Sequence, residues 1–267
     1  MGFDYSYRTG YVPFRAYQKD KRFSYCLYVP EKLKKKPTII VPVHSTDRNA
    51  ESLRNEFADL AERRGAIVCS PLFSVGISTK SDLDDYKFLN GHRIRYDKIL
   101  WGMIDEVCKD YALKNISLVL YGFSGGAQFV HRFVMLYPEM IRAAAIAAPG
   151  LITLPSKTLP WWAGCKNVAP SFGKEVDWRK IRRIKIQMLV GSLDLDQEEI
   201  ALTKDDPLWV EGADRATGTR IDRLKALRDS WRKQGVSVVW KEVEGVNHDD
   251  AKLLPIAKSF LEKYLGD

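Results

Sequence analysis

The chain has few cysteines and few histidines, and it has no long hydrophobic run. Its 267 residues include four cysteines, and none of them forms a C-x-x-C pair, so neither a disulfide scaffold nor a zinc or thioredoxin-like motif is expected. No segment approaches the roughly 18 consecutive apolar residues of a membrane-spanning helix. The first residues lack the apolar core of a signal peptide. We therefore expect a cytoplasmic protein with buried thiols and no membrane contact.

Repeats and low-complexity segments are also missing, and hydrophobic residues make up 45% of the chain, which is enough for a packed core. Lys and Arg total 42 against 34 Asp and Glu, a formal net charge of +8. The basic residues lie in separate runs at 34–36, 179–185 and 220–233, and none carries a nucleic-acid recognition motif. We interpret these runs as solvated surface and expect no nucleic-acid partner. Attraction of anionic substrates is the one functional use that this charge offers.

From residue 38 to the end, short apolar runs alternate with amphipathic stretches. This alternation predicts a mostly parallel sheet with helices on both faces. Earlier strands have no helix between them and are expected to pair antiparallel at one edge. The expected strands are 23–29, 38–44, 66–73, 116–121, 141–147, 184–190 and 236–243, and the expected helices are 51–64, 94–111, 127–137, 218–234 and 250–265.

Two long segments do not fit the alternation. Residues 74–93 form a polar loop, and a loop of this length inside a compact domain is usually functional or mobile. Residues 149–183 are rich in Pro, Gly and Trp, and we interpret them as a lid-like insertion at the carboxyl side of the sheet. On this interpretation residues 1–267 form a single domain.

The sharpest local motif is Gly122-Phe123-Ser124-Gly125-Gly126, which lies between an apolar strand and a helix. It satisfies G-x-S-x-G, and its context is the one that this motif requires. A serine on such a tight turn takes a strained backbone conformation, and small residues two positions before and after it avoid a clash. The pattern favours Ser124 as a nucleophile over a plain glycine-rich turn.

A serine nucleophile needs a base within hydrogen-bond reach, and the chain offers four histidines. His131 is seven residues past Ser124 on the same helix, roughly 10 Å along it, and cannot reach the hydroxyl. His92 lies in the polar loop, where it could line a pocket. His44 ends a strand and suits a role in shaping the backbone. His248 follows the last strand, and a histidine there can lie over the nucleophile.

The base in turn needs a carboxylate that orients its ring and stabilises the imidazolium. Asp194 and Asp196 both follow the strand that ends at Val190, and either can serve. We favour Asp194 because it is nearer the end of the strand and so better held. The order along the chain is then Ser124, Asp194, His248.

These three elements in this order resemble the α/β-hydrolase superfamily, and the resemblance covers nearly the whole chain. Within it the chain looks like the compact serine esterases related to dienelactone hydrolases, feruloyl esterases and polyhydroxybutyrate depolymerases. The resemblance implies an α/β-hydrolase fold and a small-molecule carboxylic ester as substrate, cleaved without a metal or organic cofactor. It also implies an oxyanion hole made by the backbone N–H groups of Gly125 and of Thr46, with Ser45 as the alternative.

The substrate pocket is the least determined part of the site. We expect apolar and aromatic side chains of the insertion and the polar loop to line it, although each could equally be ordinary core packing. The candidates are Leu159, Trp161, Trp162 and Phe172 of the insertion, and Tyr86, Phe88 and His92 of the loop. A serine peptidase or amidase, an acyltransferase and a non-catalytic binding protein remain alternatives on the same fold, and the oligomeric state stays undetermined.

Overall fold

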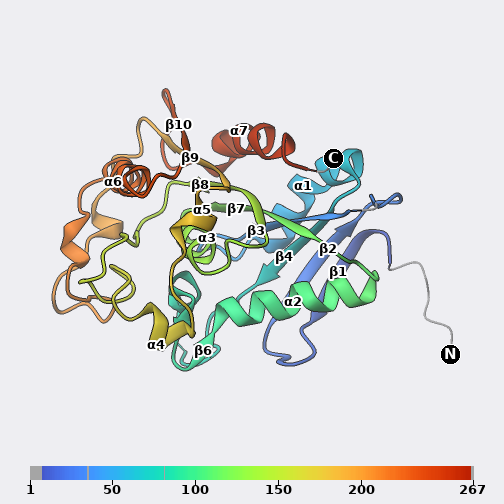
Figure 1. The fold of residues 1–267 in the computed structure, drawn as a ribbon, viewed down its shortest axis with the longest axis horizontal. Coiled ribbons are helices and arrows are strands. Elements are labelled where there is room, and N and C mark those ends of the chain that lie inside the picture. The colour runs from blue at the N-terminus through green and yellow to red at the C-terminus, as the bar shows by residue number, and fades with distance from the viewer. Residues whose placement is uncertain (1–7, 35, 81, 266–267) are drawn as a thin grey trace.

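One eight-stranded sheet runs through the molecule (Figure 1). The computed structural model describes residues 8–34, 36–80 and 82–265. The strands of this sheet are β1 (Gly10–Ala16), β2 (Ser24–Val29), β3 (Thr38–Val43), β4 (Ile67–Leu72), β7 (Ser117–Phe123), β8 (Ile141–Ala147), β9 (Lys185–Gly191) and β10 (Val238–Val243). Their spatial order is β1-β2-β4-β3-β7-β8-β9-β10.

The antiparallel part of the sheet lies at one edge, as the sequence predicts. β1 pairs antiparallel with β2, and β2 pairs antiparallel with β4, whereas the pairs from β4 to β10 are parallel. The sequence pattern did not predict β1. This strand contains Pro13 and buries only Val12, which is tolerated at a sheet edge but leaves no apolar alternation to detect.

Helices cover both faces of the sheet (Figure 1). α1 (Ala50–Arg64) and α7 (Asp250–Glu262) pack beside each other over the central strands, while α2 (Tyr96–Asp110) and α3 (Gly125–Leu136) lie on the other side. α6 (Arg220–Lys233) packs on β9 and β10. α3 begins two residues earlier than predicted, directly after Ser124.

The two long segments contain short elements of their own. The polar loop holds the 3-10 turn η2 (Asp85–Phe88) and a small hairpin, β5 (Asn90–Gly91) and β6 (Ile94–Arg95). The insertion holds α4 (Val168–Phe172) and α5 (Trp178–Ile181). Between β9 and α6 lie two further 3-10 turns, η3 (Glu198–Ile200) and η4 (Ala213–Arg215).

The core runs through the middle of the sheet. β3 is buried along its whole length, and β7 and β8 nearly so, as continuous apolar runs predict for central parallel strands. Tyr121 of β7, for example, is fully buried and packs its ring against Phe57 of α1. Within the described residues, no helix is both long and apolar enough to cross a bilayer.

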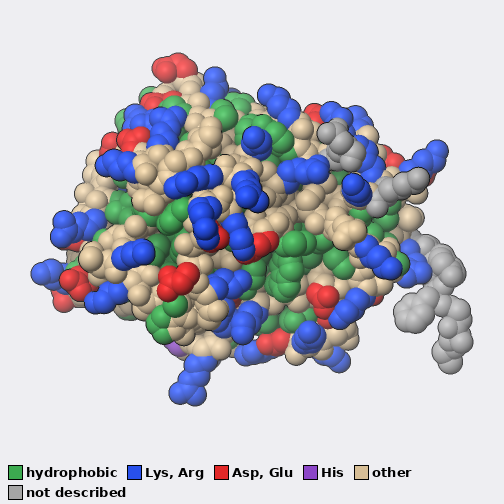
Figure 2. Space-filling view, in the orientation of Figure 1, with side chains coloured by type: hydrophobic (Ala, Val, Ile, Leu, Met, Phe, Trp, Pro, Cys, Tyr) green, Lys and Arg blue, Asp and Glu red, His purple; other side chains and the backbone are tan. Residues whose placement is uncertain are grey.

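The basic side chains are mostly solvated, with an exception in α6. Figure 2 shows Lys and Arg scattered over the visible face among acidic and apolar groups, with no single basic patch. On α6, however, Arg220 and Arg223 are buried. The interpretation of residues 220–233 as a solvated helix face was therefore wrong for these two positions, because α6 turns its first residues toward the molecule.

Candidate active site

Ser124 sits on the turn between β7 and α3 in a strained conformation. Its φ is 52° and its ψ is −114°, a region that a non-glycine residue enters only when its surroundings enforce it. Here the enforcement is hydrogen bonding on both sides. The Ser124 N–H donates to the carbonyl of Ala147 in β8, and the Ser124 carbonyl accepts from the N–H of Gln128.

Two glycines allow α3 to start this close to the sheet. A Cβ on Gly126 would lie 2.1 Å from the carbonyl oxygen of Val43, and one on Gly122 would lie 2.3 Å from the carbonyl oxygen of Gly126. Both neighbours are backbone atoms of packed elements and cannot move aside. The motif glycines therefore serve close approach, as the sequence argument requires.

The loops after β9 and β10 are joined by main-chain hydrogen bonds. The N–H of Ser192 donates to the carbonyl of Val243 at 2.9 Å, and the N–H of Leu193 donates to the carbonyl of Val246 at 2.8 Å. A Cβ on Gly191 would lie 2.1 Å from the Val246 oxygen. The loop that carries Asp194 therefore lies directly against the loop that leads to His248.

As a result, Asp194 and His248 meet. The Nδ1 atom of His248 lies 2.7 Å from Oδ2 of Asp194, whose side chain is completely buried. The Phe123 ring packs on the imidazole with a centroid distance of 4.4 Å. Asp196 is exposed and instead accepts the backbone N–H of Glu198. The structure thus brings Asp194, not Asp196, to the histidine.

The loop after β3 is held by His44. The Nδ1–H of His44 donates to the carbonyl of Ser45, and Nε2 accepts the N–H of Phe73. This is the backbone-shaping role that the sequence suggested. Complete burial lowers the pKa of His44 to about 3, so the ring stays neutral.

The two predicted oxyanion-hole residues lie beside each other. The backbone nitrogen of Thr46 is 3.3 Å from the point where a Cβ on Gly125 would stand. Gly125 is the first residue of α3, so its N–H has no partner within the helix. Ser45, the alternative, is buried, and its hydroxyl accepts the N–H of Asp47 within the same turn.

Two cavities open at Ser124, and both also include Thr46 and Glu199. The His248 cavity has a volume of about 430 Å³. Its lining comprises Ser45, Thr46, Asp47, Phe123, Ser124, Glu199, Asn247, His248, Asp249, Asp250 and Ala251. The Gln128 cavity has a volume of about 190 Å³. Its lining comprises Thr46, Asp84, Lys87, Phe88, Ser124, Gln128, Gly150, Leu151, Glu199, Ile200, Ala201, Leu202, Asp206, Leu208 and Arg220.

The charge around Ser124 differs from the charge of the whole chain. The His248 cavity is lined by four carboxylic side chains and, within the described residues, by no Lys or Arg. In the Gln128 cavity, Lys87 pairs with Asp84, and Arg220 pairs with Glu199. The lining therefore gives no support to the idea that the positive net charge serves to bind anionic substrates here.

Of the seven substrate-binding candidates expected from the sequence, Phe88 lines the Gln128 cavity and the other six line neither cavity. Trp162 is buried and donates its indole N–H to the carbonyl of Leu208. Trp161 donates to the carbonyl of Phe88, and Phe172 packs edge-on against Trp161. His92 is half-exposed on the β5–β6 turn and pairs with Asp85. These four side chains were wrongly expected at the pocket, because they hold the surrounding segments together.

Much of the actual wall comes from a segment that sequence reasoning did not single out. Residues 199–208, between β9 and α6, supply six of the residues that line the Gln128 cavity. The insertion contributes Gly150 and Leu151, and the polar loop contributes Phe88 among others. The length of the irregular stretch before α6 was the available signal. Gln128, one helical turn after Ser124, was detectable from its spacing alone.

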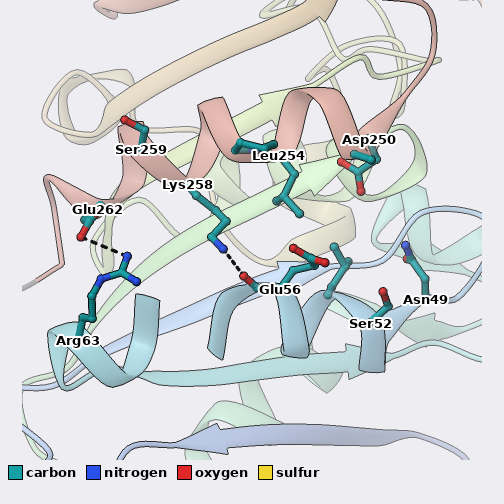
Figure 3. Close-up of a pocket in the computed structure, with 12 residues that line it drawn as sticks. Asn49, Ser52, Glu56, Arg63, Asp250, Leu254, Lys258, Ser259 and Glu262 are labelled. Atoms are coloured by element: carbon teal, nitrogen blue, oxygen red, sulfur yellow. Dashed lines mark hydrogen bonds and ion pairs between the residues drawn. The ribbon is translucent and has the colours of Figure 1, made fainter. Parts of the chain in front are cut away.

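A larger groove lies between α1 and α7 and does not include Ser124 (Figure 3). Its volume is about 500 Å³, and it shares Asp250 and Ala251 with the His248 cavity. Figure 3 shows Arg63 directed toward Glu262 across it. Its charged groups tie the two helices together.

Replacing Gly126 with alanine tests the tightness of the turn. We expect the Gly126→Ala variant to lose about 3 kcal/mol of unfolding free energy or more, because the added methyl group meets the β3 backbone. Urea denaturation measures the loss. Ala127→Gly is the matched control on the same helix and should cost about 1 kcal/mol. Equal losses for the two variants would contradict the close-approach argument.

The buried carboxyl group of Asp250 predicts how the stability of the protein depends on pH. Burial raises the pKa of Asp250 to about 6, and Tyr121 donates its hydroxyl hydrogen bond to this carboxyl group. The folded state thus holds the proton more tightly than the unfolded chain does, so this group's contribution to stability falls as the pH rises from about 4 to about 6. Thermal denaturation of Asp250→Asn across this window should show a flatter profile than the parent. Parallel profiles would count against the prediction.

Comparison with known proteins agrees with this architecture. No protein-family model and no curated protein sequence matches the chain. Among solved structures, poly(aspartic acid) hydrolase-1 from Sphingomonas sp. KT-1 has a TM-score of 0.70 at 22% identity, over 90% of this chain and 93% of that one. The poly(3-hydroxybutyrate) depolymerase LpqC from Bordetella parapertussis has a TM-score of 0.70 at 18% identity, over 92% and 85%. A ferulic acid esterase has a TM-score of 0.58 at 14% identity, over 91% and 92%.

Likeness at these identities concerns the fold. The sheet order, the nearly complete coverage of both chains and the position of the Ser124 turn all agree with the predicted fold class, which is confirmed. The chain has the α/β-hydrolase fold.

Proposed function

We propose that this protein is a serine hydrolase that cleaves small-molecule carboxylic esters through an acyl-enzyme on Ser124. One observation carries the proposal. A strained Ser124 and a His248 that is paired with buried Asp194 line the same cavity. A core histidine would be enclosed, as His131 is, and a plain glycine-rich turn would need no paired imidazole beside it.

The reaction follows from the placement of the two ring nitrogens. Nδ1 of His248 faces Asp194, which leaves Nε2 to accept the proton of the Ser124 hydroxyl. The serine oxygen attacks the ester carbonyl, and His248 then protonates the departing alcohol. A water molecule, activated by the same nitrogen, attacks the acyl-enzyme and releases the acid. Asp194 holds the ring in place and stabilises the imidazolium in each half of the cycle.

The developing oxyanion is stabilised by the backbone N–H groups of Gly125 and Thr46. Their adjacency beside the nucleophile supports this assignment, and the loss of one such donor costs about 3–4 kcal/mol of transition-state stabilisation in serine hydrolases. His44 fixes the Thr46 loop before substrate arrives. Preorganised donors of this kind need no rearrangement as charge develops.

Removal of the nucleophile tests the proposal. We expect Ser124→Ala to lower kcat for a short activated ester by a factor of about 10⁴ or more, since no other group forms the acyl-enzyme. A fluorophosphonate probe should label the parent protein and fail to label the variant. Ser45→Ala, which removes a hydroxyl from the same cavity but not the nucleophile, is the control for labelling. Unchanged hydrolysis by Ser124→Ala would refute the function.

The same experiment separates the remaining alternatives. Preferred turnover of an amide would identify a peptidase or amidase, and partition of the acyl group to an added alcohol would identify an acyltransferase. Absence of both labelling and turnover in the parent protein would identify a binding protein on the same fold.

The acidic lining predicts the charge preference for the leaving group. We expect an ester whose alcohol carries a carboxylate to react about tenfold more slowly at low salt than its neutral or ammonium-bearing counterparts, because the alcohol leaves beside His248 and four carboxylic residues. Measurement of kcat/KM for such a matched series, with and without added salt, checks this. Asp47→Asn removes an exposed charge of the lining. It should narrow the difference in kcat/KM between the anionic ester and its neutral or ammonium-bearing counterparts. A preference for the anionic ester would contradict the prediction.

A further inference from the structure

Arg220 is a buried cation at the start of α6. Its side chain is 1% exposed, yet it belongs to the lining of the Gln128 cavity. A capping box fixes the start of the helix: the Thr219 side chain accepts from the N–H of Asp222, and the Asp222 side chain accepts from the N–H of Thr219. The cap fixes Arg220 as the first residue of α6, and its side chain is buried in the molecule.

The guanidinium contacts the acid of the proposed triad. Nη1 of Arg220 lies 3.3 Å from Oδ1 of Asp194, and Nη2 lies 2.5 Å from Oε2 of Glu199. The other oxygen of Asp194 receives His248. One buried carboxylate is thus shared between an imidazole and a guanidinium, and the same guanidinium holds a residue that lines both cavities at Ser124.

This arrangement has an electrostatic consequence. A permanent cation on one oxygen of Asp194 offsets part of the negative charge that otherwise favours protonation of His248. In a buried setting such an effect is only weakly screened by salt.

We propose that Arg220 is a positioning residue for this site, which orients Asp194 through its second oxygen, restrains the basicity of His248 and anchors Glu199 in the cavity wall. The inference rests on the proposed function, because it assigns a role within the same triad. It extends that function by adding Arg220 to the proposed pair of Asp194 and His248, on the side of Asp194 away from the imidazole.

A neighbouring arginine shows that burial alone does not require this contact. Arg223, on the same helix, is 4% exposed and donates to the carbonyls of Gly150 and Gly218. It thus ties loops together without touching the triad acid. The two positions offer a matched comparison of a structural arginine with the proposed positioning one.

The charged groups around His248 determine how the test is designed. Besides Asp194, the cavity places four acidic residues around the imidazole: Asp47 from the loop after β3, Glu199 from η3, and Asp249 and Asp250 from the start of α7. Asp250 titrates in the same range as a histidine, as described above. Its contribution is removed by measuring each variant in an Asp250→Asn background as well.

The experiment is the pH profile of kcat/KM for a neutral short ester, whose acidic limb reports the free enzyme's base. In Arg220→Met we expect the midpoint of this limb to rise by about one pH unit, because the imidazolium loses a nearby cation. Arg220→Lys should keep the midpoint near that of the parent while lowering kcat, since lysine retains the charge but not the fork that spans two carboxylates. Arg223→Met should lose unfolding free energy, and its midpoint should shift less than that of Arg220→Met.

Glu199→Gln provides a test that does not depend on the folding of a core variant. The Glu199 side chain is 65% exposed, and loss of its negative charge should lower the midpoint. Opposite shifts in Arg220→Met and Glu199→Gln support the proposal. Midpoints that stay with the parent in both variants, or an Arg220→Met profile that matches Arg223→Met, would overturn it. If Arg220→Met does not fold, Arg220→Lys decides together with Glu199→Gln: a lowered kcat at the parent midpoint in Arg220→Lys and a lowered midpoint in Glu199→Gln support the proposal, and parent values of both quantities overturn it.

Failure of this inference is distinguishable from failure of the proposed function. An active Ser124→Ala variant refutes the function itself. An inactive Ser124→Ala variant together with unmoved midpoints leaves the triad in place and removes only the role of Arg220.

Discussion

The common register of the parallel strands is the constraint on which the candidate site depends. Val43 of β3 pairs with Gly122 of β7, and Val243 of β10 pairs with Gly191 of β9. These strands therefore end at the same edge of the sheet, and each releases its loop there. Ser124, Asp194, His248 and the Thr46 loop are distant in sequence, and this alignment is what makes them neighbours.

Close backbone contacts then hold these neighbouring segments in a fixed arrangement. Gly126 meets β3, and Gly191 meets the loop before His248, in both cases at a distance that excludes a side chain. The strain at Ser124 persists because these contacts and the hydrogen bond to Ala147 leave the turn no alternative. The α/β layers thus act as a rigid frame, and the chemistry proposed for Ser124 is assigned to its edge.

Whether a site residue can be predicted from the sequence depends on what determines its position in the fold. Ser124 and His248 were identifiable as candidates because their positions follow from strand ends, which apolar runs reveal, and from the scarcity of histidine. The residues that line the pocket were not identifiable, because tertiary contacts decide how irregular segments pack. Trp162 has the composition of a pocket residue but is enclosed by Phe88 and Leu208. Arg220 lies in a run of charge that predicts solvation, and its burial beside Asp194 is a tertiary contact that the run does not reveal.

The joining of the β9 and β10 loops by main-chain atoms has a further consequence. Because the bonds from Ser192 and Leu193 to the β10 side use backbone donors and acceptors, the separation of Asp194 and His248 is insulated from most side-chain changes in either loop. The wall at residues 199–208 is a separate stretch of chain. Side chains from Ile200 to Leu208 can therefore change, and the shape of the Gln128 cavity with them, while the main-chain bonds still hold Asp194 beside His248.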